Sequence, residues 1–294
     1  MLKSQSKPHS QEQKSHGSMY LAMQRFARNK SALAGLSLVL ILVVLAVLAP
    51  WLSPYAYEKI DIINAFAKPS FAHPFGTDDL GRDILSRMMY GGRYSLSIGI
   101  FSVIISAAFG IFAGSVAGYF GGQIDNIIMR LIDILQSFPQ ILLAIVISAA
   151  LGTGYDKCII ALGISGIPVF TRMMRANILT IRSMEYIEAA TSINCRDSRI
   201  IMKHVIPNAF SPLIVQISLS LAYSVLSAAS LSFIGLGVQP PNPEWGAMLS
   251  AGRNYITNYP HMVLFPGLYI MICVLAFNII GDALRDALDP KLKR

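Results

Sequence analysis

The side chains that could do chemistry are few in this sequence, and they are not grouped as catalytic residues usually are. The histidines show no H-E-x-x-H spacing, and no serine, histidine and aspartate combination suggests a nucleophile with its base. The sequence also contains no G-x-x-x-x-G-K-[ST] loop to hold nucleotide phosphates. The histidines are His9, His16, His73, His204 and His261. We therefore expect no catalytic residue, no metal site and no cofactor in this chain.

The cysteines give no stronger signal. Cys158, Cys195 and Cys273 are isolated, odd in number and without C-x-x-C spacing, so neither a disulfide nor a metal site is indicated. We interpret each as a small buried hydrophobic residue.

Composition points to a membrane protein. Hydrophobic residues make up 54% of the 294 residues and charged residues only 14%, against about 25% charged in a soluble domain. A membrane span needs about 20 apolar residues, and six stretches approach that length. They are residues 32–52, 94–119, 127–151, 158–174, 209–233 and 262–284. The sequence therefore predicts an all-α membrane protein with six transmembrane helices.

Details of these stretches refine the prediction. The first is too long for the apolar core of a signal peptide, so we interpret it as an uncleaved span. Pro139 should kink the third span. Gly163, Gly166 and Pro168 interrupt the fourth, which is the weakest of the six.

The distribution of positive charge predicts the orientation. The net charge is +8, and the larger share of the 24 Lys and Arg falls in the N-terminal tail, in the segment after the fourth span and at the C-terminus. Because cytoplasmic loops are enriched in Lys and Arg, both termini are predicted to be cytoplasmic. The loop 53–93 balances its cations with acidic residues, which suggests a folded outer element. Without basic residues interleaved with aromatics, nucleic-acid binding is not indicated.

Small residues recur every four positions in the second span. Ser102, Ser106, Gly110, Gly114 and Gly118 form one stripe of that helix. Small residues let helices approach closely in lipid. The stripe predicts close packing, either inside this chain or against another subunit.

One carboxylate falls inside a predicted span. An intramembrane acidic residue is a candidate for function by default, and Asp133 is such a residue. Arg130 precedes it by three positions and could pair with it on one helix face. We favour a structural ion pair or helix cap over a proton relay.

The segment between the fourth and fifth spans is too polar to cross a membrane. We expect a short helix over 183–193 with Tyr186, Ile187 and Ala190 on one side, and a second over 197–205 that ends before Pro207. Asp197 could cap the second helix. Such a helical pair could fit a groove in a partner protein or could be an ordinary solvated loop.

A family resemblance favours the first interpretation. Glu188-Ala189-Ala190, followed by His204 and Pro207, resembles the EAA motif of ABC importer permeases. In that family the motif forms the helix that inserts into the nucleotide-binding subunit, which implies an ATPase-coupling role for these residues.

The resemblance includes one departure at the turn of this motif. The family has Gly four residues after the second Ala, where this chain has Asn194. Asn tolerates a positive φ better than other non-glycine residues, so we expect the turn to be kept.

Other stretches narrow the resemblance to the dipeptide/oligopeptide/nickel group of these permeases and to its C-type subunit. One is the stretch 73–83, which includes Gly76, Thr77, Asp78, Asp79, Gly81, Arg82 and Asp83. Others are residues 231–238, Glu244-Trp245-Gly246 and the ending 281–286. The resemblance implies that the outer residues face a substrate-binding protein, and a purely structural role is the alternative.

Two features of these outer stretches follow from physical chemistry. Ile84, Leu85, Met88 and Met89 could lie on the membrane surface or on a neighbouring subunit. The prolines of the 239–246 stretch should stiffen that loop.

The resemblance implies a type I ABC importer permease that forms half of a pathway for short peptides, in the bacterial inner membrane. It implies a second homologous permease, a binding protein and two ATPase subunits that bind ATP and Mg²⁺. Nickel, metal-chelator complexes or glutathione are alternative substrates, and a secondary transporter is the alternative class.

The predicted organisation has five parts. Residues 1–31 form a basic cytoplasmic tail, 32–52 the first span and 53–93 an outer loop with an amphipathic segment. Residues 94–284 form the core with five spans and the coupling segment 178–207, and 285–294 form a second basic tail.

Overall fold

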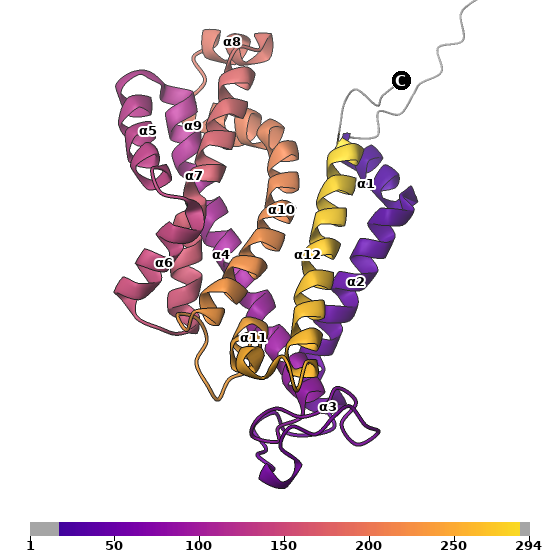
Figure 1. Cartoon of the computed structure of the whole chain (residues 1–294). Helices are drawn as coiled ribbons and strands as arrows, with labels where there is room; N and C mark the ends of the chain where they lie inside the picture. Colours follow the sequence, from indigo (N-terminus) through magenta and orange to yellow (C-terminus); the bar gives the residue numbers. More distant parts are fainter. Residues whose placement is uncertain (1–17, 289–294) are drawn as a thin grey trace, which may run out of the picture.

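The computed structural model describes residues 18–288 as a bundle of helices (Figure 1). Within this range no β-strand forms, and only an isolated bridge joins Thr77 to Asp83. Five helices are each long and apolar enough to cross a membrane, and a bent pair provides a sixth crossing if it is counted as one span. The prediction of an all-α membrane protein is confirmed.

The α-helices in chain order are α1 (Ser18–Arg28), α2 (Lys30–Val47), α3 (Ala49–Leu52), α4 (Ile84–Phe120), α5 (Gly122–Gln136), α6 (Gln140–Leu151), α7 (Tyr155–Arg182), α8 (Glu185–Ser192), α9 (Asp197–Ile200), α10 (Ile206–Phe233), α11 (Trp245–Gly252) and α12 (His261–Leu288). Short 3₁₀ turns span Ile62–Asn64 and Arg253–Tyr255, and a π-helical turn spans Ile201–Val205.

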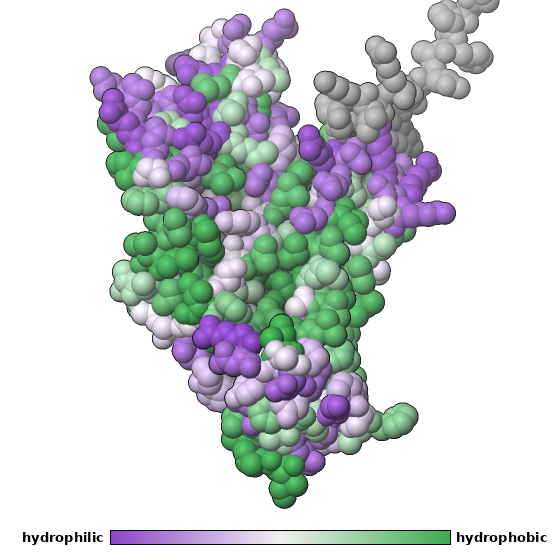
Figure 2. Space-filling model, in the orientation of Figure 1, coloured by the Kyte–Doolittle hydropathy of each residue, from purple (hydrophilic) through white to green (hydrophobic). Residues whose placement is uncertain are grey.

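The bundle has an apolar middle, with different helices and loops at its two ends. Helices α8, α5 and α1 and the end of α12 lie at one end, and α3, α11 and the loop 53–83 lie at the other (Figure 1). Helix α4 packs against α7, α10 packs between α4 and α12, and α12 packs against α2. Hydrophobic residues form a band over the middle of the face that Figure 2 shows, with mostly hydrophilic residues on the α8 side of the band and a mixed surface with a hydrophobic tip on the other side. This is the surface expected of a chain that crosses a bilayer.

Helix α4 extends further than the predicted second span. Its 37 residues measure about 55 Å, well over the roughly 30 Å of a bilayer core. The helix begins at Ile84 because the Asp83 carboxylate accepts a hydrogen bond from the Ser86 N–H at 2.8 Å. Ile84 and Met88 are buried against Met248 and Met262. For these two residues, the prediction that they lie on the membrane or on another subunit was wrong.

Four of the five small residues of the stripe on α4 face α7, and the fifth, Ser102, donates to the Ser224 Oγ of α10 at 3.1 Å. A Cβ on Gly110 would lie 2.5 Å from the Phe170 Cβ, and one on Gly114 would lie 2.5 Å from the Thr171 carbonyl oxygen. A Cβ on Gly118 would lie 3.0 Å from the Ile178 Cβ. The stripe therefore packs within this chain, since the two backbones approach too closely for side chains between them.

The predicted third span is broken rather than kinked. Helices α5 and α6 meet at an angle of 85°. Pro139 is extended, with φ −52° and ψ 135°, and it lacks the N–H that would continue the helix. The bend leaves α6 with 12 residues, which alone is too short to cross a bilayer.

Ion pairs fasten α5 to α7. Asp125 binds Arg175 through two contacts of 2.5 and 2.6 Å. Asp133 lies 2.5 Å from Arg172, so the interpretation as an ion pair is supported but the partner is not Arg130. Arg130 shares its helix with Asp133, whereas Arg172 comes from the neighbouring helix against which that face of α5 packs.

Prolines interrupt two other helices less than expected. Helix α7 runs unbroken through Pro168, from Tyr155 to Arg182. The prediction that a helix would end before Pro207 was wrong, because α10 begins at Ile206 directly after the π-helical turn. In that turn the Ile206 N–H bonds to the Ile201 carbonyl, and this wider turn accommodates a proline that has no N–H of its own.

The α4–α7 contact yields a stability prediction. Gly114→Ala should lower the free energy of unfolding by about 1–3 kcal/mol, because the added methyl group overpacks the contact. The measurement is the thermal unfolding midpoint of the purified chain in detergent. Gly267→Ala is the matched control, since its Cβ would have 3.8 Å of clearance within α12. Equal stability of the two variants would contradict this account of the packing.

Candidate functional site

Helix α8 is a short amphipathic helix that follows α7 after a break at Met184. Met184 is extended, with φ −87° and ψ 141°, and its carbonyl accepts the N–H of Ile187 at 2.9 Å. Ile187 is 3% exposed and packs into a core cluster with Ile178 and Ile200. Glu188 lies in the first turn, where a negative charge is favoured by the helix dipole. The helix therefore has one face fixed to the bundle and one face free.

The turn after α8 has the conformation predicted from its sequence. Asn194 has φ 55°, in the left-handed region. Its N–H bonds to the Thr191 carbonyl at 2.9 Å, and the Cys195 N–H bonds to the Ala190 carbonyl at 3.1 Å. These two bonds form a Schellman motif with Asn194 at the position usually held by glycine. The expectation that the turn is kept is confirmed.

The rest of the predicted coupling residues lie along α8 and the start of α10. Ala189 is exposed, and Ala190 is partly buried against the core cluster. Pro207 is exposed in the first turn of α10. His204 belongs to the π-helical turn, and its side chain lies outside the described part of the structure.

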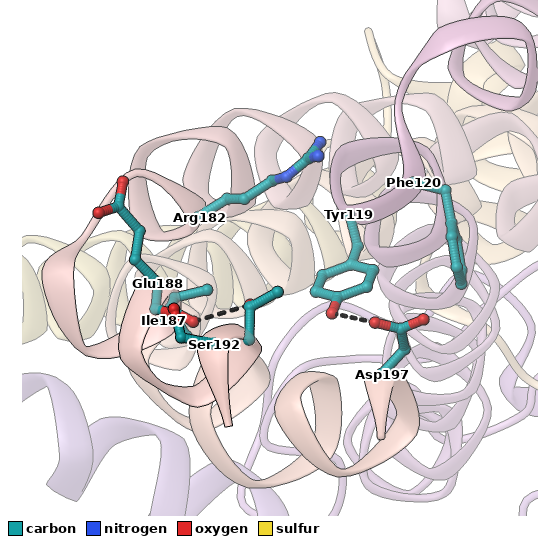
Figure 3. Close-up of a pocket in the computed structure, with 8 residues that line it drawn as sticks. Tyr119, Phe120, Arg182, Ile187, Glu188, Ser192 and Asp197 are labelled. Carbon is teal, nitrogen blue, oxygen red and sulfur yellow. Dashed lines mark hydrogen bonds between the residues drawn. The ribbon is translucent and has the colours of Figure 1, made fainter. Parts of the chain in front are cut away.

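A hydrogen bond joins this segment to the end of α4. The Tyr119 hydroxyl donates to the Asp197 carboxylate at 2.6 Å, across a groove of ≈ 620 Å³ between α4, α8 and α9 (Figure 3). Nothing local in the sequence indicates this bond, since its partners are 78 positions apart. Asp197 is the first residue of α9 rather than the cap that precedes the helix, so the prediction that it caps the helix was wrong. Its carboxylate binds Tyr119 and thereby holds α9 to α4.

Helices α8 and α9, called here the α8–α9 pair, have a side that no other part of the described chain covers. The Glu188 side chain points away from Tyr119 and Asp197 (Figure 3), and its carboxylate has no hydrogen bond or ion pair with any residue between 18 and 288. Ile193 is 80% exposed and Met202 is 67% exposed at the same end of the bundle. Exposed apolar side chains and an unpaired carboxylate at one end of the bundle, outside the apolar band, are typical of a protein interface.

The stretch 73–83, at the end of the bundle opposite α8, is held together by its own side chains. The Asp78 carboxylate accepts bonds from the Arg82 N–H at 2.9 Å and the Arg82 Nε at 2.7 Å. Asp79 lies 3.8 Å from Arg82. Asp83 also lies 2.9 Å from the His73 Nδ1, in addition to capping α4.

Backbone conformation and a threonine complete this loop. Thr77 is fully buried, and its hydroxyl donates to the Asn64 carbonyl at 2.5 Å. Gly76 and Gly81 have φ values of 78° and 74°. Gly81 lies so close to the Asp61 carbonyl that a Cβ would overlap it. These contacts give the motif a structural role in shaping the loop.

The Glu244-Trp245-Gly246 stretch is equally buried. Glu244 accepts hydrogen bonds from the Ser95 hydroxyl and the Ala247 N–H, both at 2.9 Å. Its burial raises the pKa of the carboxyl above the ordinary value. The Trp245 Nε1 donates to the Met88 carbonyl at 3.0 Å, and Gly246 lies directly against the backbone of Ala229. These residues join α11 to α4 and α10, and their side chains are not available to a partner.

Comparison with known protein families gives two matches. The family of the binding-protein-dependent transport system inner membrane component matches residues 110–294. The N-terminal TM domain of oligopeptide transport permease C matches residues 19–69.

Similar proteins and a similar structure agree with these matches. The dipeptide transport system permease protein DppC of Alkalihalophilus pseudofirmus is 45% identical over 272 residues, covering 92% of this chain and 90% of the relative. The glutathione transport system permease protein GsiD of Escherichia coli is 46% identical over 271 residues, covering 92% and 89%. A chain of the MetNI methionine ABC transporter in an inward-facing conformation shares the fold, with a TM-score of 0.56 and 18% identity over 69% of this chain and 96% of that one. On these matches, the chain belongs to the family of inner-membrane components of binding-protein-dependent transport systems, and it is a transport permease rather than an enzyme.

Proposed function

We propose that this chain forms half of the membrane pathway of an ATP-driven importer for short peptides. Two similar permeases carry the names of dipeptide and glutathione transport systems, and both names describe small peptides. A second homologous permease would complete the pathway, and two nucleotide-binding subunits would bind ATP and Mg²⁺. This chain would contribute no cofactor of its own.

The observation that carries the proposal is the free outer side of the α8–α9 pair. The unpaired Glu188 carboxylate and the exposed Ile193 and Met202 offer a charge and an apolar contact to one partner. An ATPase subunit with a complementary groove would supply a hydrogen-bond donor for Glu188 and cover the apolar side chains. Glu188, Ala189 and Ala190 would form the contact surface, with Asn194 and Pro207 setting its direction.

The same arrangement supports an orientation. We infer that the α8 end of the bundle is cytoplasmic, because ATPase subunits act there and because Lys and Arg are concentrated in the segments at that end. The tails 1–31 and 285–294 would then both be cytoplasmic. The loop 53–93 would be extracytoplasmic, with the core 94–284 and its coupling segment 178–207 following it.

The extracytoplasmic end would receive the substrate-binding protein. The buried residues of the two outer motifs would act as the scaffold of this surface rather than as its contacts. Exposed apolar side chains of the same loop are better placed to touch a partner, since Ile63 is 94% exposed and Phe71 is fully exposed.

Force would pass from the ATPase to the bundle through packed contacts. Ile187 fixes α8 to α7, and Tyr119 fixes α9 to α4. When ATP draws the two ATPase subunits together, the α8–α9 pair would move with them and favour the outward-open state. ATP can shift the equilibrium only by the difference in its affinity for the two states, so this contact must differ between them.

Reversing the charge at Glu188 tests the docking surface. Glu188→Arg should place a cation where the partner provides a donor, which costs several kcal/mol, so ATP-dependent peptide uptake should fall at least about tenfold. The measurement is uptake and ATP hydrolysis by the complete transporter in proteoliposomes. The control variant is Asp286→Arg, which makes the same charge reversal at an exposed carboxylate of α12 at the same end of the bundle. Uptake equal to wild type in Glu188→Arg, at equal assembly, would disprove the coupling role.

Removing the Tyr119 hydroxyl tests the link to α4. Tyr119→Phe should lower the peptide imported per ATP hydrolysed by about three- to tenfold, because a hydrogen bond to a charged group contributes about 1.5–3 kcal/mol and only part of it differs between states. A double-mutant cycle with Asp197→Ala isolates this one bond. Additive effects of the two changes would show that the bond has no part in coupling.

A further inference from the structure

A cavity of ≈ 270 Å³ lies between α4, α6, α7 and α10. Its α10 wall, residues 216–224, and its α7 wall, residues 162–170, are the middle parts of the two helices. The cavity therefore lies near the centre of the apolar band. Its polar lining residues are Ser106, Gln140, Gln216, Ser220, Tyr223 and Ser224.

The large polar groups of this cavity are poorly satisfied. Gln216 donates one bond, from its Nε2 to the Ser220 Oγ at 3.1 Å. The Gln140 amide and the Tyr223 hydroxyl make no side-chain hydrogen bond with any residue in the described range 18–288. An unpaired amide or hydroxyl in an apolar environment costs about 2–7 kcal/mol. These groups must therefore meet water or a polar molecule in at least one state of the transporter.

The lining has no charge. No Asp, Glu, Lys or Arg contributes to it among the described residues. A glutamine side chain presents a donor and an acceptor side by side, which is the complement of a peptide bond. Charged peptide termini or charged side chains would find no counter-ion here, whereas a peptide backbone would find partners for its N–H and C=O groups.

We propose that this cavity is the part of the translocation pathway in which this chain holds the peptide backbone, through Gln140, Gln216 and Tyr223. The inference rests on the proposed import of short peptides. The cavity is slightly smaller than an ordinary small-molecule pocket of about 300–1,000 Å³, so it accommodates part of a peptide. Tyr223 is 41% exposed, and the second permease would close the cavity on its side.

Photocrosslinking from the Tyr223 position tests the proposal directly. The complete transporter carries p-benzoylphenylalanine in place of Tyr223 and receives a radiolabelled dipeptide from its binding protein in proteoliposomes. We expect a crosslink between this chain and the peptide that requires ATP. The control carries the same probe in place of Leu226, which is 48% exposed on the same helix and does not line the cavity, and it should give no crosslink to the peptide.

The outcomes separate this inference from the proposed function. ATP-dependent uptake by the wild type, with no peptide crosslinked at position 223, would overturn the cavity proposal and leave the function standing. Absence of ATP-dependent uptake of any short peptide by the wild type would overturn the proposed function and the cavity proposal with it.

A substitution gives a second, independent measurement. Gln216→Leu removes the amide while keeping a similar side-chain size, and it should reduce peptide uptake about three- to tenfold for each hydrogen bond lost to the peptide. ATP hydrolysis should continue. Gln136→Leu makes the same change at an exposed position of α5 outside the cavity and should leave uptake unchanged. Equal uptake by the two variants would contradict the proposal.

The charge-free lining also predicts the range of substrates. Dipeptides with acidic, basic and neutral side chains, each delivered by a binding protein that accepts it, should lose uptake to the same degree in Gln216→Leu. A loss confined to one charge class would show that this cavity recognises side chains and would overturn the assignment to the backbone.

Discussion

The close contact between α4 and α7 fixes the position of the longest helix of this chain. Gly110, Gly114 and Gly118 bring the two backbones together with no side chain between them. Helix α4 is continuous over 37 residues, so this contact aligns its two ends at once. One end carries the Asp83 cap, and the other end carries Tyr119 beside α9. Because both ends belong to one continuous helix, no loop separates the Asp83 cap from the bond between Tyr119 and α9.

One hydrophobic cluster connects the α8–α9 pair to the cavity between α4, α6, α7 and α10. Ile187 and Ile200 belong to the same hydrophobic cluster as Val103 and Phe170. Val103 and Phe170 also line the cavity between α4, α6, α7 and α10. Closely packed interiors transmit displacement because they have little free volume. On the proposed mechanism, movement of α8 would reach the wall of the cavity through these direct contacts.

Features that depend on residues close together in the chain could be predicted from the sequence. Features that depend on partners far apart in the chain could not. Apolar length identified the spans, and the tolerance of asparagine for positive φ identified the turn at Asn194. Asp133 was assigned to Arg130, its neighbour in the chain, because the side of α5 that faces Arg172 depends on tertiary packing. The continuation of the helix through Pro207 was also missed, since a π-helical turn depends on the packing of Val205 and Ile200 in the core.

Most carboxylates of the structural motifs are hydrogen-bonded within the chain, whereas polar side chains of the proposed functional surfaces lack such partners. In the stretches 73–83 and 244–246, Asp78, Asp83 and Glu244 find partners within the chain, so these three positions are explained by the shape of the loops. The buried Asp79 Oδ1 is the exception, since it has no hydrogen-bond partner among the described residues. Glu188 lacks a described partner and faces solvent, and Gln140 lacks one near the centre of the apolar band. A polar group without a protein partner is stable in water but raises the free energy of the folded state in an apolar environment. Glu188 and Gln140 therefore differ in their need for a partner. The Glu188 carboxylate is solvated by water when no ATPase is bound, so its lack of a partner does not destabilise the chain. The polar groups of the cavity need water or a bound molecule for the bundle to remain stable.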